Sequence, residues 1–200
     1  TPELDGARKQ AKIAIFIPAY NAAYTLPAVL DRIPLDIKDK VQQIFVIDNA
    51  SPDNTHLIGI GYREQKKLDK LEVFRNPTNR GYGGSQKMAY RYSIDNGFDI
   101  IVMLHGDAQY APEKISSLLE PLENGEADMV FGSRIAGLPL AGGMPLYKFL
   151  GNKFLTTIQN RILGMNLTEF HSGFRLFLCA ALAQVPFDLP RSTFGRLVRI

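Results

Sequence analysis

The chain has 200 residues, of which 46% are hydrophobic and 22% charged, and its formal net charge is +3. This composition is close to that of an average globular protein and excludes a wholly disordered chain, a collagen-like repeat and a coiled coil. The single cysteine, Cys179, excludes an internal disulfide, and its apolar surroundings predict a buried, inert thiol. That apolar run, 176–183, is much shorter than the roughly 20 residues that a membrane-spanning helix needs.

Charge is distributed unevenly along the chain. Residues 1–130 carry 15 basic and 18 acidic side chains, whereas residues 131–200 carry 8 basic and 2 acidic ones. The second part is therefore expected to face an anionic partner such as phosphates or a lipid surface, with a solvated basic face as the alternative. The chain does not begin with Met, has no signal segment and stops at Ile200 without a terminator, which is typical of a fragment of a longer protein.

Short apolar runs rich in β-branched residues alternate with helical segments. The runs that predict strands are 13–17, 44–47, 71–74, 100–104, 129–131 and 174–178. Helices are expected after an N-cap at Thr25, from 53–55 toward Lys70, from Ser85 to 96–97, over 115–123 and over 146–163. This alternation predicts an α/β fold with a mostly parallel sheet covered by helices on both faces. We expect one domain over residues 13–200, after an N-terminal extension over residues 1–12.

In open α/β sheets the ligand lies beyond the carboxyl ends of the strands, so the residues that follow each strand are candidates for a site. Asp48 follows the second strand, where its carboxylate either accepts hydrogen bonds from a nucleotide or caps a turn. Asp107 and Gln109 follow the fourth strand and offer two oxygen ligands that suit Mg²⁺ or Mn²⁺, a capped turn being the alternative. His105 is a third candidate ligand, better suited to Mn²⁺ than to Mg²⁺.

Further polar segments could bind phosphate. The glycine-rich segment 79–85 opens a helix, where backbone N–H groups attract anions. Arg134 stands at the end of one predicted strand and Arg175 at the start of the next, and each either holds a phosphate or pairs on the surface.

Taken in chain order, these segments resemble glycosyltransferase family 2, the inverting enzymes with the nucleotide-diphospho-sugar-binding GT-A fold, and most closely its dolichol-phosphate mannosyltransferase-like branch. The resemblance runs from Ile13 to about Phe177. It rests on residues 15–21 (PAYN turn), 46–53 (VDDGS-x-D), 79–83 (N-x-G-x-G), 105–113 (D-x-D-x-Q-x-x-P-E), 132–134 (GSR) and 169–175 (D-x-x-S-G-F-R).

The resemblance implies a role for each matching residue. The nucleotide would be bound by Pro18, Tyr20, Val46, Asp48, Asn79 and Gly83. Asp107 and Gln109, with His105 beside them, would bind Mg²⁺ or Mn²⁺. Arg134 and Arg175 would hold the phosphates of the donor or acceptor, and Glu169 is the candidate base.

This chain also departs from the family pattern at four positions. Ala22 stands where a Glu usually follows PAYN, and Asn49 replaces the second Asp of VDDGS. Tyr82 occupies a position where Lys is often found, and His105 replaces the first Asp of D-x-D.

The implied reaction transfers a sugar from a nucleotide-diphosphate sugar, with inversion, in glycan or cell-envelope synthesis. A polyprenyl phosphate acceptor needs no general base, whereas a sugar hydroxyl would need Glu169 or His171. The basic second part favours the lipid phosphate. Alternatives are a transferase that acts on a sugar hydroxyl, a non-catalytic nucleotide-sugar-binding module and a nucleotidyltransferase.

We expect a cytoplasmic protein with no nucleic-acid partner and with peripheral contact at the cytoplasmic face of a membrane. The predicted helix 146–163 has apolar residues beside Lys148 and Lys153 that would suit such contact, although their helical spacing alone favours a core.

Overall fold

The structure is a computed structural model that describes residues 10–133, 146–164, 168–170, 172–187 and 198–199. In chain order the elements are β1 (Ile13–Ala19), α1 (Leu26–Arg32), α2 (Leu35–Lys40), β2 (Gln43–Asp48), α3 (Thr55–Lys66), β3 (Leu71–Arg75), α4 (Gly81–Asp95), β4 (Ile100–Met103), η1 (Pro112–Lys114), α5 (Ile115–Glu123), β5 (Met129–Phe131), α6 (Leu146–Leu163), β6 (Arg175–Leu178), α7 (Cys179–Leu182) and β7 (Val198–Arg199).

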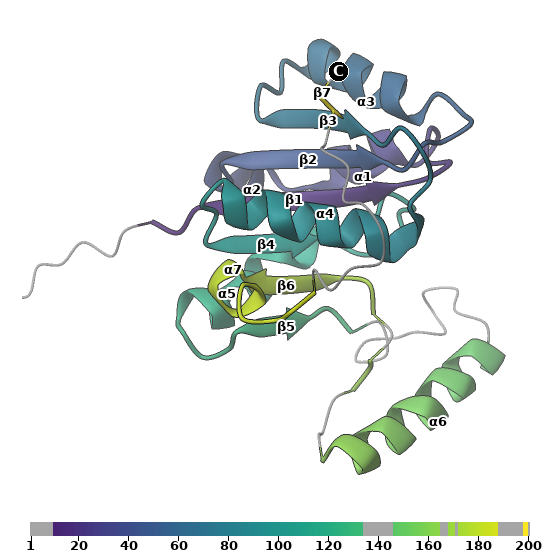
Figure 1. The fold of residues 1–200 in the computed structure, drawn as a ribbon, viewed down its shortest axis with the longest axis vertical. Helices are drawn as coiled ribbons and strands as arrows, with labels where there is room; N and C mark the ends of the chain where they lie inside the picture. Colours follow the sequence, from purple (N-terminus) through teal and green to yellow (C-terminus); the bar gives the residue numbers. More distant parts are fainter. Residues whose placement is uncertain (1–9, 134–145, 165–167, 171, 188–197, 200) are drawn as a thin grey trace, which may run out of the picture.

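One sheet organises the molecule, with the strand order β5-β6-β4-β1-β2-β3-β7 (Figure 1). The pairs β4–β1, β1–β2 and β2–β3 are parallel, whereas β6 runs antiparallel to β4 and β5, and β7 runs antiparallel to β3. Strands β1 to β5 therefore all point the same way, and only β6 and β7 run against them. This confirms the mostly parallel α/β sheet predicted from the sequence.

The central strand β1 is buried on both faces because helices cover the sheet from both sides. Ile13, Ile15 and Ile17 pack with residues of α1, α2, α3 and α5, whereas Ala14 and Phe16 pack with residues of α4 and α7 on the other face. This two-sided burial explains why the strand is a continuous apolar run rather than an alternating one.

The second face contains an aromatic cluster that fixes α4 on the sheet. The Phe45 ring of β2 lies 5.4 Å from that of Phe16 and 4.9 Å from that of Tyr92 on α4. Aromatic contacts of this kind contribute about 0.5–1.5 kcal/mol each beyond their burial. Cys179 of α7 lies on the same face, and its burial raises the pKa of the thiol to about 12. The thiol is buried, as predicted.

Some boundaries differ from the predicted ones. Helix α4 begins at Gly81 rather than at Ser85, because side chains from outside the helix accept hydrogen bonds from its first N–H groups. Helix α3 ends at Lys66, because Lys67 adopts a left-handed conformation with a φ of 51°. Thr25 makes no capping hydrogen bond to α1 and instead donates to the Gly106 carbonyl. The helices α2 and α7 and the strand β7 were not predicted.

The proposed division into residues 1–12 and 13–200 stays a prediction, and residues 1–9 lie outside the described part. Within the described residues, no helix is long and apolar enough to cross a membrane.

Candidate functional site

A cavity of about 420 Å³ opens at the carboxyl ends of β1, β2 and β4, beside the beginning of α4. Parallel strands place their carboxyl ends at one edge, so the turns that follow these three strands meet there. Among the predicted site residues, the cavity is lined by Pro18, Tyr20, Asn79, His105 and Asp107.

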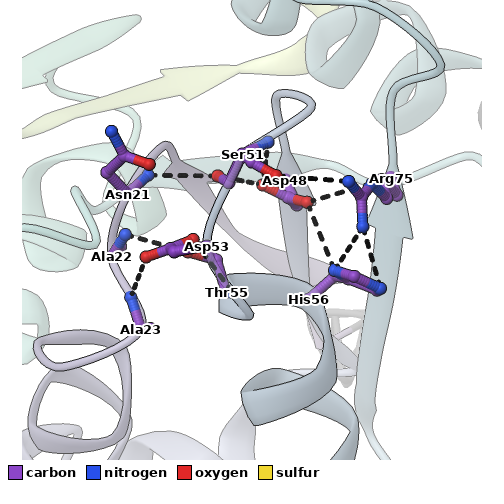
Figure 2. Close-up of polar contacts among 9 residues, drawn as sticks. All are labelled: Asn21, Ala22, Ala23, Asp48, Ser51, Asp53, Thr55, His56 and Arg75. Carbon is purple, nitrogen blue, oxygen red and sulfur yellow. Dashed lines mark hydrogen bonds and ion pairs between the residues drawn. The ribbon is translucent and has the colours of Figure 1, made fainter.

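The turn after β1 is held in place by side chains of the loop between β2 and α3 and of the first residue of α3 (Figure 2). The backbone N–H groups of residues 21–23 donate in order to Ser51 Oγ, Thr55 Oγ1 and Asp53 Oδ2, over 2.9–3.2 Å. Burial acts to raise the pKa of Asp53, but the hydrogen bonds from Thr55 and from this turn outweigh it and lower the pKa. The PAYN-like turn forms one wall of the cavity, and the VDDGS-x-D-like segment, with Thr55, holds that turn in place.

Asp48 caps its turn, which is the alternative that the sequence left open. Its side chain is fully buried, and Oδ1 accepts hydrogen bonds from the backbone N–H and the hydroxyl of Ser51. Its other oxygen, Oδ2, lies 3.6 Å from Arg75 Nε and 3.8 Å from His56 Nδ1 (Figure 2).

Asp48 and Val46 do not line the cavity in the described part of the chain. The Val46 side chain is buried in the core of the sheet. A nucleotide contact for either residue stays a prediction, as it does for Gly83, which lies in the first turn of α4 outside the cavity lining.

Three asparagines join the ends of β2 and β3 to the beginning of α4. Asn49 donates through Nδ2 to Asn79 Oδ1 over 2.8 Å, and its Oδ1 accepts from Asn76 Nδ2 and from the Arg80 N–H, each over 2.9 Å. Asn79 Oδ1 also accepts the Gly81 N–H. Asn49 thus acts as donor and acceptor at once, which the Asp of the family pattern would not do when ionised.

The turn after β4 brings His105 and Asp107 together at the cavity. Gly106 N–H donates to the Pro18 carbonyl over 3.3 Å, so this turn lies against the end of β1. The His105 Nδ1 and Asp107 Oδ2 atoms are 4.0 Å apart. Asp107 Oδ1 accepts the Gln109 N–H, and Ala108 between them has a φ of 61°. The turn is therefore capped as well as directed at the cavity.

This donor set fits a divalent cation, because a carboxylate beside an imidazole, with an amide two residues on, offers oxygen and nitrogen ligands. The described residues contain no group of three His, Cys, Asp or Glu side chains arranged for a metal. Gln109 is exposed and does not line the cavity, so its predicted ligand role stays a prediction.

A second cavity of about 290 Å³ adjoins the first, because Tyr82 and His105 line both. Arg175 lines the second cavity, where its guanidinium donates from Nε to the Ser172 carbonyl over 2.7 Å and from Nη2 to the Phe170 carbonyl over 3.1 Å. These bonds hold the Arg175 side chain in one orientation. Burial raises the pKa of Tyr82, so its hydroxyl stays protonated at neutral pH.

Glu169 lies outside both cavities. Its side chain is 1% exposed, and its Oε1 accepts a 2.8 Å hydrogen bond from Asn152 Nδ2 of α6. These contacts give Glu169 a structural role, as a buried and hydrogen-bonded carboxylate. Its role as a base stays a prediction. Arg134 and His171 lie outside the described residues.

Four residues were not predicted to belong to the site: Thr25, expected only as an N-cap, Asn49, Tyr82 and Tyr110. Asn49 and Tyr82 had a usable signal, since both depart from the family pattern beside matched positions. Thr25 and Tyr110 act through partners far away in sequence, Gly106 and Gly173, and no local pattern marks them.

Comparisons with known proteins agree on the family and the fold. The family described as "Glycosyl transferase family 2" matches residues 14–185. An undecaprenyl-phosphate mannosyltransferase from Micrococcus luteus is 28% identical over 88% of this chain and 70% of its own length. A UDP-N-acetylglucosamine–dolichyl-phosphate N-acetylglucosaminyltransferase from Methanococcus voltae is 29% identical over 85% of this chain and 70% of its own.

Solved structures show the same fold at low sequence identity. A mannosyltransferase from Pyrobaculum calidifontis in complex with GDP-Man and Mn²⁺ is 19% identical, with a TM-score of 0.63 over 91% of this chain and 49% of its own. A glucosyl-3-phosphoglycerate synthase from Mycobacterium tuberculosis in complex with Mn²⁺ and UDP-glucose is 20% identical, with a TM-score of 0.62 over 88% and 58%. The chain therefore spans less than two thirds of these solved chains.

The asparagine cluster yields a test of how the cavity wall is held. Asn49→Asp replaces the donor that faces Asn79 Oδ1 with a carboxylate oxygen, so two acceptors would face each other. We expect a loss of about 1–3 kcal/mol in the free energy of unfolding, measured by urea denaturation. Asn54→Asp is the matched control, because Asn54 is exposed at the beginning of α3. Equal stability of the two variants would contradict this account of Asn49.

Proposed function

The chain belongs to glycosyl transferase family 2, and we propose that it transfers a sugar from a nucleotide-diphosphate sugar, with inversion, to a polyprenyl phosphate. The observation that carries this proposal is the pair of adjoining cavities, with Asp107 in the first and Arg175 in the second. The acceptors named for the relatives from Micrococcus luteus and Methanococcus voltae, undecaprenyl and dolichyl phosphate, support it.

The first cavity is the proposed donor site. Gly81 lines it at the first residue of the 15-residue helix α4, so the positive end of that helix faces the space where a diphosphate would lie. Pro18, Tyr20 and Asn79 line the same cavity and would contact the nucleoside. The three polar turns are held by one another, so the wall is formed before a ligand arrives.

Asp107, with His105 and Gln109, is the proposed holder of Mg²⁺ or Mn²⁺. A divalent cation at this place would stabilise the negative charge that develops on the departing diphosphate. Asp107 is half-exposed at the cavity, where its Oδ1 accepts the Gln109 N–H and its Oδ2 lies on the side of His105.

The second cavity is the proposed acceptor site, and its chemistry favours a phosphate. Arg175 offers a fixed guanidinium, whose planar fork suits phosphate oxygens. Glu169, the candidate base for a sugar hydroxyl, is buried and already hydrogen-bonded to Asn152. A phosphate acceptor is an anion at neutral pH and attacks without a base.

Helix α6 is proposed to contact the membrane that carries the lipid acceptor. Its apolar side chains face outward, with exposed fractions from 39% to 75% at Tyr147, Leu150, Phe154, Leu155, Ile158 and Ile162. The spacing of these residues favours a core, but the structure leaves them exposed and buries the polar Thr156. Figure 1 shows α6 standing apart from the sheet.

Charge decides which occupant suits this face. The sequence of α6 contains Lys148, Lys153 and Arg161 and no acidic residue. A helix that combines exposed apolar residues with basic residues and has no acidic residue is typical of helices that lie in the interface of an anionic bilayer. We therefore assign the face to an anionic lipid surface, at the same membrane as the proposed acceptor.

The acceptor assignment is tested by Arg175→Lys. Lysine keeps the charge but loses the paired donors, so transfer to a short-chain polyprenyl phosphate should fall by about tenfold or more. The affinity for the nucleotide-sugar donor should change by less than about twofold, because Arg175 lies outside the donor cavity. Arg63→Lys on α3 is the control, since Arg63 pairs on the surface with Glu64. Efficient transfer to a neutral sugar, with no transfer to lipid phosphate, would contradict the proposed acceptor.

The membrane contact is tested by replacing two outward apolar residues. Phe154→Glu with Ile162→Glu should abolish cosedimentation with vesicles that contain anionic lipid, while leaving donor binding unchanged. Leu57→Glu with Ile58→Glu is the matched control, because both residues are exposed and belong to α3, which is far from α6 in the sequence. Unchanged binding of the α6 variant would contradict the assignment. So would a concentration-dependent dimer that the variant abolishes, because the face would then belong to a second copy of the chain.

A further inference from the structure

The buried carboxylate of Asp48 depends on one arginine. The Asp48 side chain is fully buried, and its Oδ1 accepts hydrogen bonds from the N–H and the hydroxyl of Ser51. Its Oδ2 accepts no hydrogen bond from the described residues, and its nearest basic group is Arg75, whose Nε lies 3.6 Å away. A buried carboxylate is costly without a positive charge nearby. Arg75 therefore supplies the charge that lets Asp48 stay buried.

Arg75 reaches Asp48 because the two residues stand opposite each other at the ends of β3 and β2. From there its guanidinium extends to the turn that follows β2, where Nη2 donates to the Ser51 carbonyl over 3.2 Å. Its Nη1 lies 2.6 and 2.9 Å from the two ring nitrogens of His56 on α3 (Figure 2). The three nitrogens of one side chain thus face the first residue of the turn, its last residue and the helix that follows.

The turn over residues 48–51 needs such bonds because its backbone is strained. Ala50 has a φ of 57°, in the left-handed region that is unfavourable for a residue with a Cβ atom. The hydrogen bonds from Ser51 to Asp48 Oδ1 keep the turn closed, and the bond from Arg75 to the Ser51 carbonyl holds its last residue. Arg75 therefore helps to fix the position of the Ser51 hydroxyl.

The position of the Ser51 hydroxyl matters for the first cavity, because Asn21 lines that cavity. The Asn21 N–H donates to Ser51 Oγ over 3.0 Å, and Asn21 has a left-handed φ of 52°. The next two N–H groups, of residues 22 and 23, donate to other side chains. Of the three bonds that hold the turn after β1, one therefore depends on Arg75 through Ser51.

We propose that Arg75 is a positioning residue of the donor site and acts through Asp48 and Ser51 on the backbone of Asn21. This rests on the proposed function, because it takes the first cavity as the place of the nucleotide. Asp48 then serves the nucleotide without contacting it, since its oxygens face Ser51 and Arg75 and the described lining of the cavity does not include it. Recognition of the nucleoside is left to the turn after β1 and the beginning of α4.

The first test compares amide hydrogen exchange at residues 21–23 by NMR. Arg75→Lys keeps the positive charge but loses the donor to the Ser51 carbonyl, because one ammonium group does not replace the fork of a guanidinium. Exchange of the Asn21 N–H should become about fivefold faster or more, while exchange of the next two N–H groups stays unchanged. Arg63→Lys on the surface of α3 is the control and should change none of the three.

A role of Arg75 in overall stability alone would give a different pattern, in which all three N–H groups exchange faster together. If the lysine variant is too unstable to measure, Arg75→Gln combined with Asp48→Asn removes both buried charges at once. The same selective change at Asn21 is expected in this double variant.

The second test measures the affinity for UDP and for GDP by calorimetry, in the presence of Mn²⁺. Arg75→Lys and Ser51→Ala should each weaken binding by about threefold or more. The double variant should bind no more weakly than Ser51→Ala, because both changes act through the same bond. Asp48→Asn should likewise add no loss to that of Ser51→Ala. In Arg75→Lys the affinity for a short-chain polyprenyl phosphate should change by less than about twofold.

An Asn21 exchange rate that is unchanged in Arg75→Lys, or raised together with the next two, would overturn the proposal. So would an additive loss of affinity on combining Asp48→Asn with Ser51→Ala, because Asp48 would then contact the nucleotide itself. If the parent binds neither nucleotide while the selective exchange at Asn21 is observed, the proposed function alone is contradicted.

Discussion

The parallel register of β1 with its two neighbours decides where the polar residues of the site lie. Ala19 at the end of β1 stands opposite Asp48 at the end of β2, and Phe16 stands opposite Met103 at the end of β4. Because all three strands point the same way, the turns that follow them open at one edge. A shift of one residue in either pairing would exchange the side chains of the two faces of β1, which pack against different helices.

The loops at that edge stabilise one another as well as the helices that follow them. Thr25 donates to the carbonyl of Gly106, and Asn49 of one turn supports the beginning of α4. Each of these bonds contributes only about 1 kcal/mol, but leaving its buried partner unsatisfied would cost more. The polar wall of the first cavity, the proposed donor site, is therefore formed by the fold itself, which is the condition for electrostatic stabilisation without reorganisation.

The sheet could be predicted from the sequence because its strands are short, continuous apolar runs bounded by polar turns. The contacts of individual site residues were harder to predict. Asp48 has the same position in its strand whether it faces a ligand or caps a turn, so the sequence could not predict its contacts with Ser51 and Arg75. Periodicity likewise could not tell that α6 faces outward with its apolar side, because helical spacing is the same for a core helix and an interfacial one.

The departures from the family pattern became informative only in three dimensions. In the sequence, Asn49, Tyr82 and His105 are three separate replacements of a charged residue of the family pattern, and the loss of Asp at position 105 suggests a weaker metal site. In the structure Asn49 is a required donor, and Tyr82 and His105 are partners at the boundary between the two cavities. The site is thus changed in a coordinated way, and its proposed chemistry remains that of a sugar transferase.

The central claim is that this chain moves a sugar onto a lipid phosphate. The most direct measurement incubates the chain with a panel of nucleotide-diphosphate sugars, Mn²⁺ and a short-chain polyprenyl phosphate, and identifies the product by mass spectrometry and anomeric NMR signals. The account predicts a polyprenyl-phosphate sugar whose anomeric configuration is inverted relative to the donor, formed together with one nucleoside diphosphate per turnover. A retained configuration, or donors bound with no product from any acceptor phosphate, would contradict it.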